Sequence, residues 1–216
     1  MIKIIPTLFT LSQKEFNLQI KNLTFANTIH IDFMDGQFTQ NKSISFKDME
    51  DLTKLKNINL EVHVMGYEPL KYMSYFKKYN FKKIYIHYEV FETDSEMQYE
   101  IFELKNKGFK VGIAINPSTN VEDIIHYFDM IDSIMLMSVW PGMQGQNFIN
   151  KTYNKIEKIE ENNFKGTVTI DGGINETNIK KLAKQNIDTL YIGSYISQSN
   201  NPKQNYEKLK SLISKK

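Results

Sequence analysis

Several residue types are missing from this 216-residue chain, and each absence excludes a class of protein. There is no cysteine, which excludes disulfide bonds, thiolate nucleophiles and cysteine-ligated zinc. No apolar run approaches the roughly 18 residues that a membrane-spanning helix needs. Met1 leads directly into a strand-like segment without a signal-peptide pattern. We therefore expect a cytoplasmic protein that has no membrane partner.

Arginine is also absent, since all 27 basic residues are lysine. An anionic ligand therefore cannot be held by a bidentate guanidinium group. A phosphate would have to bind to backbone N–H groups, to helix N-termini or to lysine. The formal net charge is only +2, and the lysines are scattered without a basic tract. Nucleic acid is therefore not an expected partner.

What the chain contains is a regular alternation of short β-rich apolar segments and longer amphipathic segments. Hydrophobic residues make up 41% and charged residues 24%, as in ordinary globular proteins. The expected strands are Lys3–Leu8, Thr28–Asp32, Ile58–Val64, Lys83–His87, Lys110–Ile115, Ser133–Ser138, Gly166–Ile170 and Thr189–Ile192. The expected helices are Gln13–Ala26, Phe46–Leu55, Leu70–Lys78, Ser95–Lys107, Val121–Phe128, Tyr153–Asn162, Glu176–Lys184 and Lys203–Ser214. Helix-capping residues support several of these boundaries: Ser12, Asn120 and Asn175 at N-termini and Gly108 at a C-terminus.

Strict alternation of strands and helices predicts a parallel sheet. Eight pairs in 216 residues give about 27 residues per pair, near the lower end for a (β/α)₈ barrel. A doubly wound open sheet is the alternative, but it usually has fewer strands and a glycine-rich turn after the first strand. The first expected strand ends instead in Pro6-Thr7-Leu8. We therefore predict an α/β fold, a (β/α)₈ TIM barrel, with residues 1–216 as a single domain.

The polar residues at the expected strand ends point to chemistry, because the active sites of such barrels lie at that end. His30, Asp32 and Met34 alternate along one strand, so their side chains share one face. His63 and His87 end two other strands, which places three of the four histidines at this end. The fourth, His126, lies inside an expected helix, where we interpret it as structural.

His30, Asp32, His63 and Asp171 together form a set of two imidazoles and two carboxylates from three strands. Such a set can bind a divalent ion, with imidazole suited to Zn, Fe, Co or Mn. Two carboxylates on opposite sides of a bound substrate could also move protons on opposite faces of one carbon. The spacing alone is equally compatible with separate capped turns that hold no metal.

Glycine-rich segments follow three of the last strands. They are Pro141-Gly-Met-Gln-Gly-Gln146, Asp171-Gly-Gly-Ile-Asn175 and Gly193-Ser194. In these barrels the loops after strands 7 and 8 often bind phosphate, and glycine lets backbone N–H groups approach an anion closely. Ordinary tight turns would explain any one of these segments, but less readily all three.

Taken together, these motifs closely resemble the ribulose-phosphate 3-epimerase family. The resemblance runs through nearly the whole chain, in the segments Pro6-Thr7, His30-Ile-Asp-Phe-Met-Asp-Gly36, Asn41, Val62-His-Val-Met65, Ile86-His87, Asn116-Pro117, Met137-Ser-Val-Trp-Pro-Gly142, Gly145-Gln146, Asp171-Gly-Gly-Ile-Asn175 and Gly193-Ser194. It implies a barrel of the ribulose-phosphate-binding type, a homo-oligomer, and a phosphorylated ketose as substrate. The implied reaction is metal-dependent C3 epimerisation through an ene-diolate, with D-ribulose 5-phosphate and D-xylulose 5-phosphate as the usual pair.

Site residues follow from the resemblance position by position. His30, Asp32, His63 and Asp171 would bind one divalent ion (Zn, Fe, Mn or Co), and Asp32 and Asp171 would also be the catalytic acid–base pair. The implied substrate-binding residues are Thr7, Met34, Met65, Met137, Gly142, Met143, Gln144, Gly145, Gly172, Gly173, Gly193 and Ser194.

The chain also departs from the family pattern in four loop segments. Thr7 stands where serine is usual, and Gln37-Phe-Thr-Gln-Asn41 where His-Phe-Val-Pro-Asn is common. Trp140 replaces a small polar or acidic residue, and Gly-Met-Gln-Gly-Gln replaces Gly-Phe-Gly-Gly-Gln at 142–146. None of these changes touches a metal ligand, so we expect the chemistry to be retained. The changed loops leave the substrate open, and two alternatives remain. One is an epimerase for another ketose phosphate, such as allulose 6-phosphate or a sugar of a specialised glycan pathway; the other is a non-catalytic sugar-phosphate binding protein.

Overall fold

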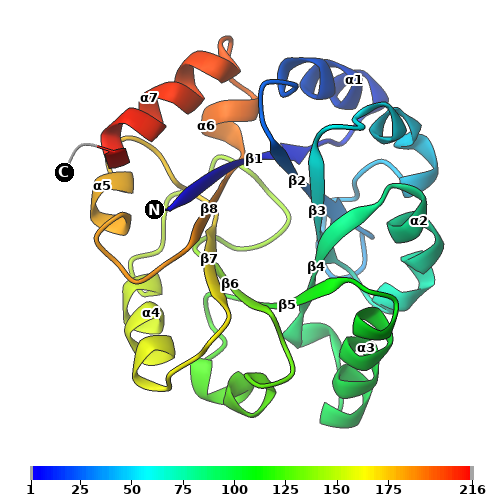
Figure 1. The fold of residues 1–216 in the computed structure, drawn as a ribbon, viewed down its shortest axis with the longest axis vertical. Coiled ribbons are helices and arrows are strands. Elements are labelled where there is room, and N and C mark those ends of the chain that lie inside the picture. The colour runs from blue at the N-terminus through cyan, green and yellow to red at the C-terminus, as the bar shows by residue number, and fades with distance from the viewer. Residues whose placement is uncertain (1, 215–216) are drawn as a thin grey trace.

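Eight parallel strands close into a barrel in the computed structural model, which describes residues 2–214. Neighbours in the barrel are also neighbours in sequence, and the last strand pairs with the first. Helices surround this barrel on the outside (Figure 1). The (β/α)₈ prediction is therefore confirmed. The strands are β1 (Lys3–Phe9), β2 (Thr28–Met34), β3 (Asn59–Met65), β4 (Phe81–His87), β5 (Lys110–Ile115), β6 (Ser133–Met137), β7 (Thr167–Asp171) and β8 (Thr189–Ile192).

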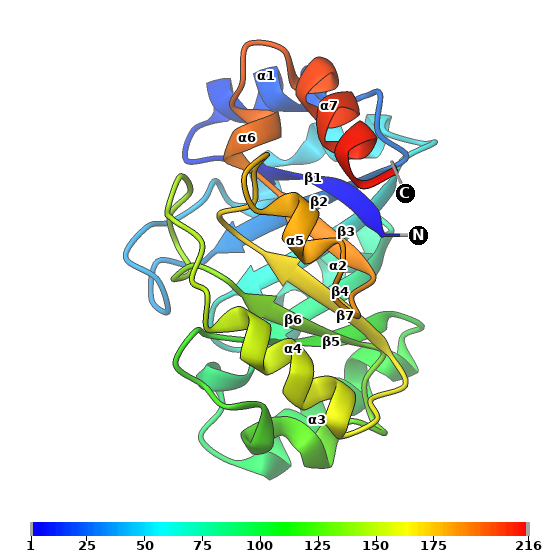
Figure 2. The same cartoon turned by 90° about the vertical axis from the view of Figure 1, so that its left-hand side faces the viewer.

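Every neighbouring pair of strands is parallel, so all eight run toward one end of the barrel. Long loops after β2 and β6 project beyond that end (Figure 2). The α-helices are α1 (Gln13–Asn22), α2 (Met73–Lys78), α3 (Asp94–Asn106), α4 (Thr152–Glu161), α5 (Ile179–Leu182), α6 (Ser194–Ser197) and α7 (Pro202–Ser214). The 3₁₀ helices are η1 (Phe46–Asp48), η2 (Glu50–Lys54), η3 (Pro69–Tyr72), η4 (Tyr88–Val90) and η5 (Val121–Tyr127). Within the described residues, no helix is both long and apolar enough to cross a bilayer.

Local sequence signals explain most helix boundaries. The Ser12 side chain accepts a hydrogen bond from the Glu15 N–H at the start of α1, as predicted for an N-cap. Gly108 has φ of +86°, the left-handed conformation that glycine adopts most readily, two residues after α3. The prediction for Asn175 was wrong, since α5 begins later and its N-cap is Asn178.

Two expected helices are in fact 3₁₀ helices, and their apolar spacing explains why. In η5, the buried residues Val121, Ile124 and Tyr127 recur every third position. Phe46, Met49 and Leu52 repeat the same spacing across η1 and η2. A period of three residues matches the 3.0 residues per turn of a 3₁₀ helix, whereas an α-helix would rotate the third residue away from the core.

Side chains alternate along each strand between two buried regions, the layer between the barrel and the helices and the inside of the barrel. Ile29, Ile31 and Phe33 of β2 are buried against the surrounding helices as part of the main apolar core. His30 and Asp32, between them, face the inside of the barrel together with a smaller apolar cluster. The barrel interior therefore carries the chemical groups, while the outer layer supplies most of the apolar packing.

A buried acid on α3 predicts a pH-dependent contribution to stability. Glu100 is only 8% exposed, and burial raises the pKa of its carboxyl from 4.5 to about 7. The folded pKa of Glu100 is the higher one, so the protonated carboxyl group favours the folded state. Its contribution to the free energy of unfolding is fully present below the unfolded pKa and is lost as pH rises through the folded pKa. Between about pH 5 and about pH 8, the wild-type free energy of unfolding should fall by on the order of 1–2 kcal/mol relative to Glu100→Gln.

Urea unfolding of both proteins across that range measures the difference. Glu157→Gln, at an exposed position of α4, is the matched control and should keep the wild-type slope. If wild type and Glu100→Gln have parallel stability profiles, the buried carboxyl does not titrate as expected.

Candidate metal centre and active site

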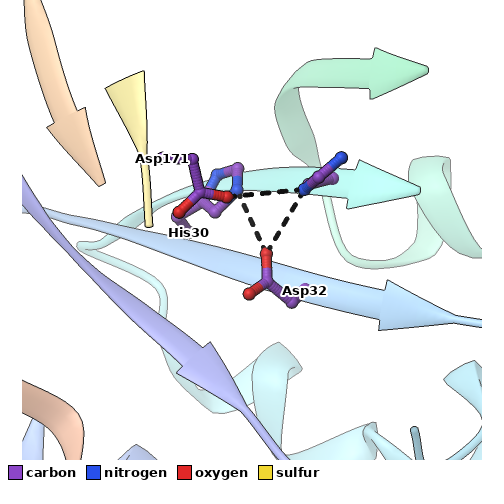
Figure 3. Close-up of side chains that lie close together, drawn as sticks. His30, Asp32 and Asp171 are labelled. Carbon is purple, nitrogen blue, oxygen red and sulfur yellow. Dashed lines mark ion pairs between the residues drawn. The ribbon is translucent and has the colours of Figure 1, made fainter. Parts of the chain in front are cut away.

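Two histidines and two aspartates converge inside the barrel near the ends of the strands. One ligand atom from each of His30, Asp32, His63 and Asp171 lies within 4.8 Å of the others. The Asp32 Oδ1 atom is 3.5 Å from His30 Nε2 and also 3.5 Å from His63 Nδ1. His63 Nδ1 is 3.6 Å from Asp171 Oδ2. Figure 3 shows the side chains of His30, Asp32 and Asp171 directed toward one point.

Strand register produces this convergence. His30 and Asp32 are two residues apart on β2 and so point the same way. The β2–β3 register sets Asp32 beside His63, which brings the third side chain to the same level. Asp171 ends β7 and reaches the cluster across the closed barrel. The structure thus brings together all four residues of the predicted metal set.

The electrostatics of the cluster favour positive charge at its centre. Burial acts to raise the pKa of Asp32, but His30 and His63 outweigh it and hold that pKa below its usual value. Burial raises the pKa of Asp171, and the negative charge of Asp32 adds to this effect. Burial disfavours protonated His63, yet Asp171 and Asp32 together raise the pKa of this imidazole to about 9. The two carboxylates therefore attract a cation into the space between them.

The donor atoms fit a divalent metal ion. Three of their six separations are 3.5 to 3.6 Å, and all six are within 4.8 Å. The three short ones are close to the tetrahedral edge of about 3.4 Å that metal–ligand bonds of ~2.1 Å give. Both ring nitrogens of His30 and of His63, and Asp32 Oδ1, are buried without a hydrogen-bond partner in residues 2–214. Buried polar atoms without partners are costly, and a metal ion would satisfy those that face the centre.

A cavity at the barrel mouth has the two carboxylates in its wall. Asp32 and Asp171 line it, whereas His30 and His63 lie deeper and are fully buried. Most of the predicted substrate contacts also line this cavity: Met65, Met137, Gly142, Met143, Gln144, Gly145, Gly172, Gly173, Gly193 and Ser194.

Thr7 and Met34 do not line the cavity, although the family resemblance implies that both contact substrate. Thr7 is 1% exposed, and β1 continues two residues beyond it, so that Phe9 occupies the mouth instead. Met34 is fully buried in a cluster with Phe9 and Met65. The strand expected from sequence ends one residue early, at Leu8, and so misses Phe9, which has the same strand face as Thr7.

The glycine loops leave backbone donors at the cavity. The N–H of Gly173 donates no hydrogen bond to the backbone of another described residue. Gly172 has φ of +107°, and a Cβ there would lie 2.3 Å from Val139 Cγ2. At Gly193, a Cβ would lie 2.1 Å from the Gln144 side-chain nitrogen and would displace that side chain. Glycine at both positions therefore lets the chain pass directly beside the cavity wall.

The other two histidines have different surroundings. His87 is fully buried, and its Nδ1 atom is 2.8 Å from Glu89 Oε2. Burial lowers the pKa of His87 to about 4 despite the neighbouring Glu89. His126 lies on η5, 3.3 Å from Asp94, and does not belong to the cluster, as its interpretation as structural required.

Sequence comparison relates the chain to proteins of one family. The model of the ribulose-phosphate 3 epimerase family matches residues 3–197. Ribulose-phosphate 3-epimerase from Helicobacter pylori strain J99 is 29% identical over 207 residues, which cover 94% of each chain. The enzyme of that name from Bacillus subtilis is 30% identical over 203 residues, covering 91% of this chain and 92% of the relative. Another from Chlamydia muridarum is 34% identical over 176 residues, covering 79% and 76%.

Solved structures share the barrel at much lower sequence identity. A ligand complex of KGPDC from Streptococcus mutans has a TM-score of 0.77 and 12% identity, covering 99% of this chain and 97% of that one. The 3-hexulose-6-phosphate synthase from Salmonella typhimurium has a TM-score of 0.72 and 14% identity, covering 99% of each chain. At such identities the likeness establishes the fold alone.

Proposed function

The chain belongs to the ribulose-phosphate 3-epimerase family, and on that premise we propose that it interconverts D-ribulose 5-phosphate and D-xylulose 5-phosphate by metal-dependent epimerisation at C3. Membership makes it an isomerase that acts as a carbohydrate epimerase. The observation that carries the proposal is the convergence of Asp32 and Asp171, which line one cavity, with two fully buried histidines. The homo-oligomeric assembly and the cytoplasmic location stay predictions.

Two carboxylates from different strands are what inversion at one carbon requires. In the proposed reaction, one of Asp32 and Asp171 removes the C3 proton, and the bonding electrons move toward the C2 ketone to give an ene-diolate. The other carboxyl group then donates its proton to the opposite face of C3. After the reaction, the carboxylate that took the proton is protonated and the other carboxyl group is ionised. Proton exchange with solvent then restores the starting protonation of Asp32 and Asp171.

His30, His63 and the two aspartates would bind the divalent ion. When bound, such an ion polarises the ketone and stabilises the negative charge that develops on its oxygen. His30 and His63 are fully buried and do not line the cavity, and as ligands their nitrogen lone pairs would be directed to the ion, so they would not compete for the C3 proton. This division of roles leaves proton transfer to the two carboxylates, which alone of the four reach the cavity surface.

We propose that the substrate phosphate binds at the glycine loops on the same cavity. Gly173 presents a backbone N–H group without a backbone acceptor in the described part of the chain, and Gly142, Gly145, Gly172 and Gly193 line the cavity near it. Without arginine, neutral backbone donors become the main means of holding the phosphate. Ser194 adds a hydroxyl to this wall.

A substrate panel in deuterium oxide tests the proposal. Solvent deuterium should enter C3 of D-ribulose 5-phosphate, and D-xylulose 5-phosphate should appear, when Zn, Fe, Mn or Co is supplied. NMR spectroscopy follows both the exchange and the new epimer. If no ketose phosphate in the panel takes up deuterium with any of the four metals, the protein is not an epimerase of this class and a binding role replaces it.

A longer ketose phosphate is the second candidate substrate, and the shape of the mouth favours it. Trp140 and Met143 are 50% and 58% exposed there. Both also line a neighbouring groove formed with residues 38–41, where Asn41 Nδ2 donates a hydrogen bond of 2.9 Å to the Gly142 carbonyl. An exposed aromatic ring beside the cavity can pack against an additional sugar carbon. A higher kcat/KM for allulose 6-phosphate than for ribulose 5-phosphate would identify this specificity.

A further inference from the structure

The two ligand histidines lack the support that metal-binding histidines usually have. A ligand imidazole normally donates its second nitrogen to a carboxylate, a carbonyl or water, which fixes the orientation of the ring. Here neither nitrogen of His30 nor of His63 forms a hydrogen bond with any residue that the structure describes. Among the described residues, ring stacking is the contact that can fix the planes of both rings.

His30 lies flat against the ring of Tyr191. The ring centroids are 3.9 Å apart and the planes differ by 24°. Tyr191 is fully buried, and its hydroxyl donates a hydrogen bond of 2.5 Å to Glu61 Oε2. The same hydroxyl is 3.1 Å from the hydroxyl of Tyr85. Two polar contacts thus hold one end of the Tyr191 ring, and this fixes the surface on which His30 packs.

His63 has an equivalent arrangement on the other side of the cluster. Its ring stacks on His87, with centroids 4.8 Å apart and planes differing by 29°. His87 is held by the hydrogen bond between its Nδ1 atom and Glu89. Glu89 in turn accepts hydrogen bonds from the Asn116 N–H and the Thr119 hydroxyl. Each ligand ring therefore stacks on a second ring that a carboxylate anchors.

We propose that Tyr191 and His87 are positioning residues that set the ring planes of His30 and His63 for metal binding. A stacked imidazole cannot rotate about its Cβ–Cγ bond without losing contact with its neighbour. The anchoring carboxylates, Glu61 and Glu89, keep that neighbour from rotating as well. This inference rests on the metal centre of the proposed function, and it assigns the supporting role to ring stacking instead of to hydrogen bonds.

Cobalt binding to the metal-free full-length protein tests the proposal. Titration with Co²⁺ gives a Kd, and the visible absorption of the bound ion reports its coordination geometry. Tyr191→Leu and His87→Leu should each raise the Kd by about 10- to 100-fold, the range observed when the groups supporting metal ligands are removed. Both should also shift the absorption spectrum, which a loss of global stability alone does not do.

Conservative variants keep the test valid if the leucine variants fold poorly. Tyr191→Phe retains the stacked ring but loses its contact with Glu61, so its Kd should rise by a smaller, several-fold factor. Tyr127→Phe is the matched control, because that buried hydroxyl also donates to a carboxylate, Asp94, at 2.6 Å, and lies outside the cluster. Its Kd and spectrum should equal those of the wild type.

The outcomes separate the two levels of inference. If wild-type protein binds Co²⁺ but every Tyr191 and His87 variant binds it with the same Kd and spectrum, the stacking proposal is wrong and the metal centre stands. If the wild-type protein binds no Co²⁺, the metal centre fails and the stacking proposal fails with it.

Discussion

Asp32→Asn and Asp171→Asn should each reduce the rate of epimerisation by about three orders of magnitude or more, within the range that general acid–base groups contribute. Asparagine keeps the shape of the side chain and an oxygen that can face a metal ion, but it cannot accept the C3 proton. With one carboxylate left, inversion is blocked because no group can serve the opposite face. The measurement is the rate of conversion between the two epimers, with the metal content of each variant determined in parallel.

Isotope exchange makes this prediction sharper. A single-Asp variant still has one base, so solvent deuterium should enter only the epimer whose C3 hydrogen faces the remaining carboxylate. The two variants should therefore label opposite epimers, each without inversion. Asp129→Asn, at an exposed position outside the cluster, serves as the control and should keep wild-type rates. Substantial epimerisation by both single-Asp variants would reject the two-base scheme.

Removing the metal should have the second largest effect. Several kilocalories per mole of charge stabilisation would be lost, which corresponds to a rate decrease of about a thousandfold. An ion present at about 1,000 times its Kd stabilises the folded state by about 4 kcal/mol. For a protein of this length, chelation should therefore lower Tm by roughly 10 °C. Treatment with a chelator, followed by Tm and rate measurements, checks both effects.

Reconstitution and substitution complete this test. Zn, Fe, Mn or Co should restore both activity and Tm to the metal-free protein. His63→Ala should bind the restored metal weakly, whereas His126→Ala changes a histidine 3.3 Å from Asp94 on the protein surface and should behave as wild type. Full activity after exhaustive chelation, with no metal detectable, would contradict the proposed role of the cluster.

Much of the fold follows from local sequence pattern. The bounds Lys110–Ile115 and Thr189–Ile192 were predicted correctly, because β-branched residues and flanking polar residues mark both strands. The 3₁₀ helices were missed, although the three-residue spacing of Val121, Ile124 and Tyr127 could have indicated them. Short helices of this kind form largely by packing of one face on the barrel, and propensity alone does not distinguish them from α-helices.

The candidate site, like the fold, was predicted in part from local sequence pattern. Alternation along a strand is a local property, so the sequence by itself determined that His30 and Asp32 share a face at a strand end. That this face is the inside of the barrel was decided by closure of the sheet. The sequence also determined the donor types, because the absence of arginine left backbone amides, helix N-termini or lysine for the phosphate, and the absence of cysteine left nitrogen and oxygen ligands for the metal.

Only the tertiary structure decided which of these side chains meet. Barrel closure and strand register bring Asp171 to His63, and the length of β1 puts Phe9 at the mouth where Thr7 was expected. The stacking of Tyr191 on His30 joins β8 to β2, which are not adjacent in the barrel. Such contacts depend on the relative positions of strands that are far apart in sequence, and no local pattern encodes that distance.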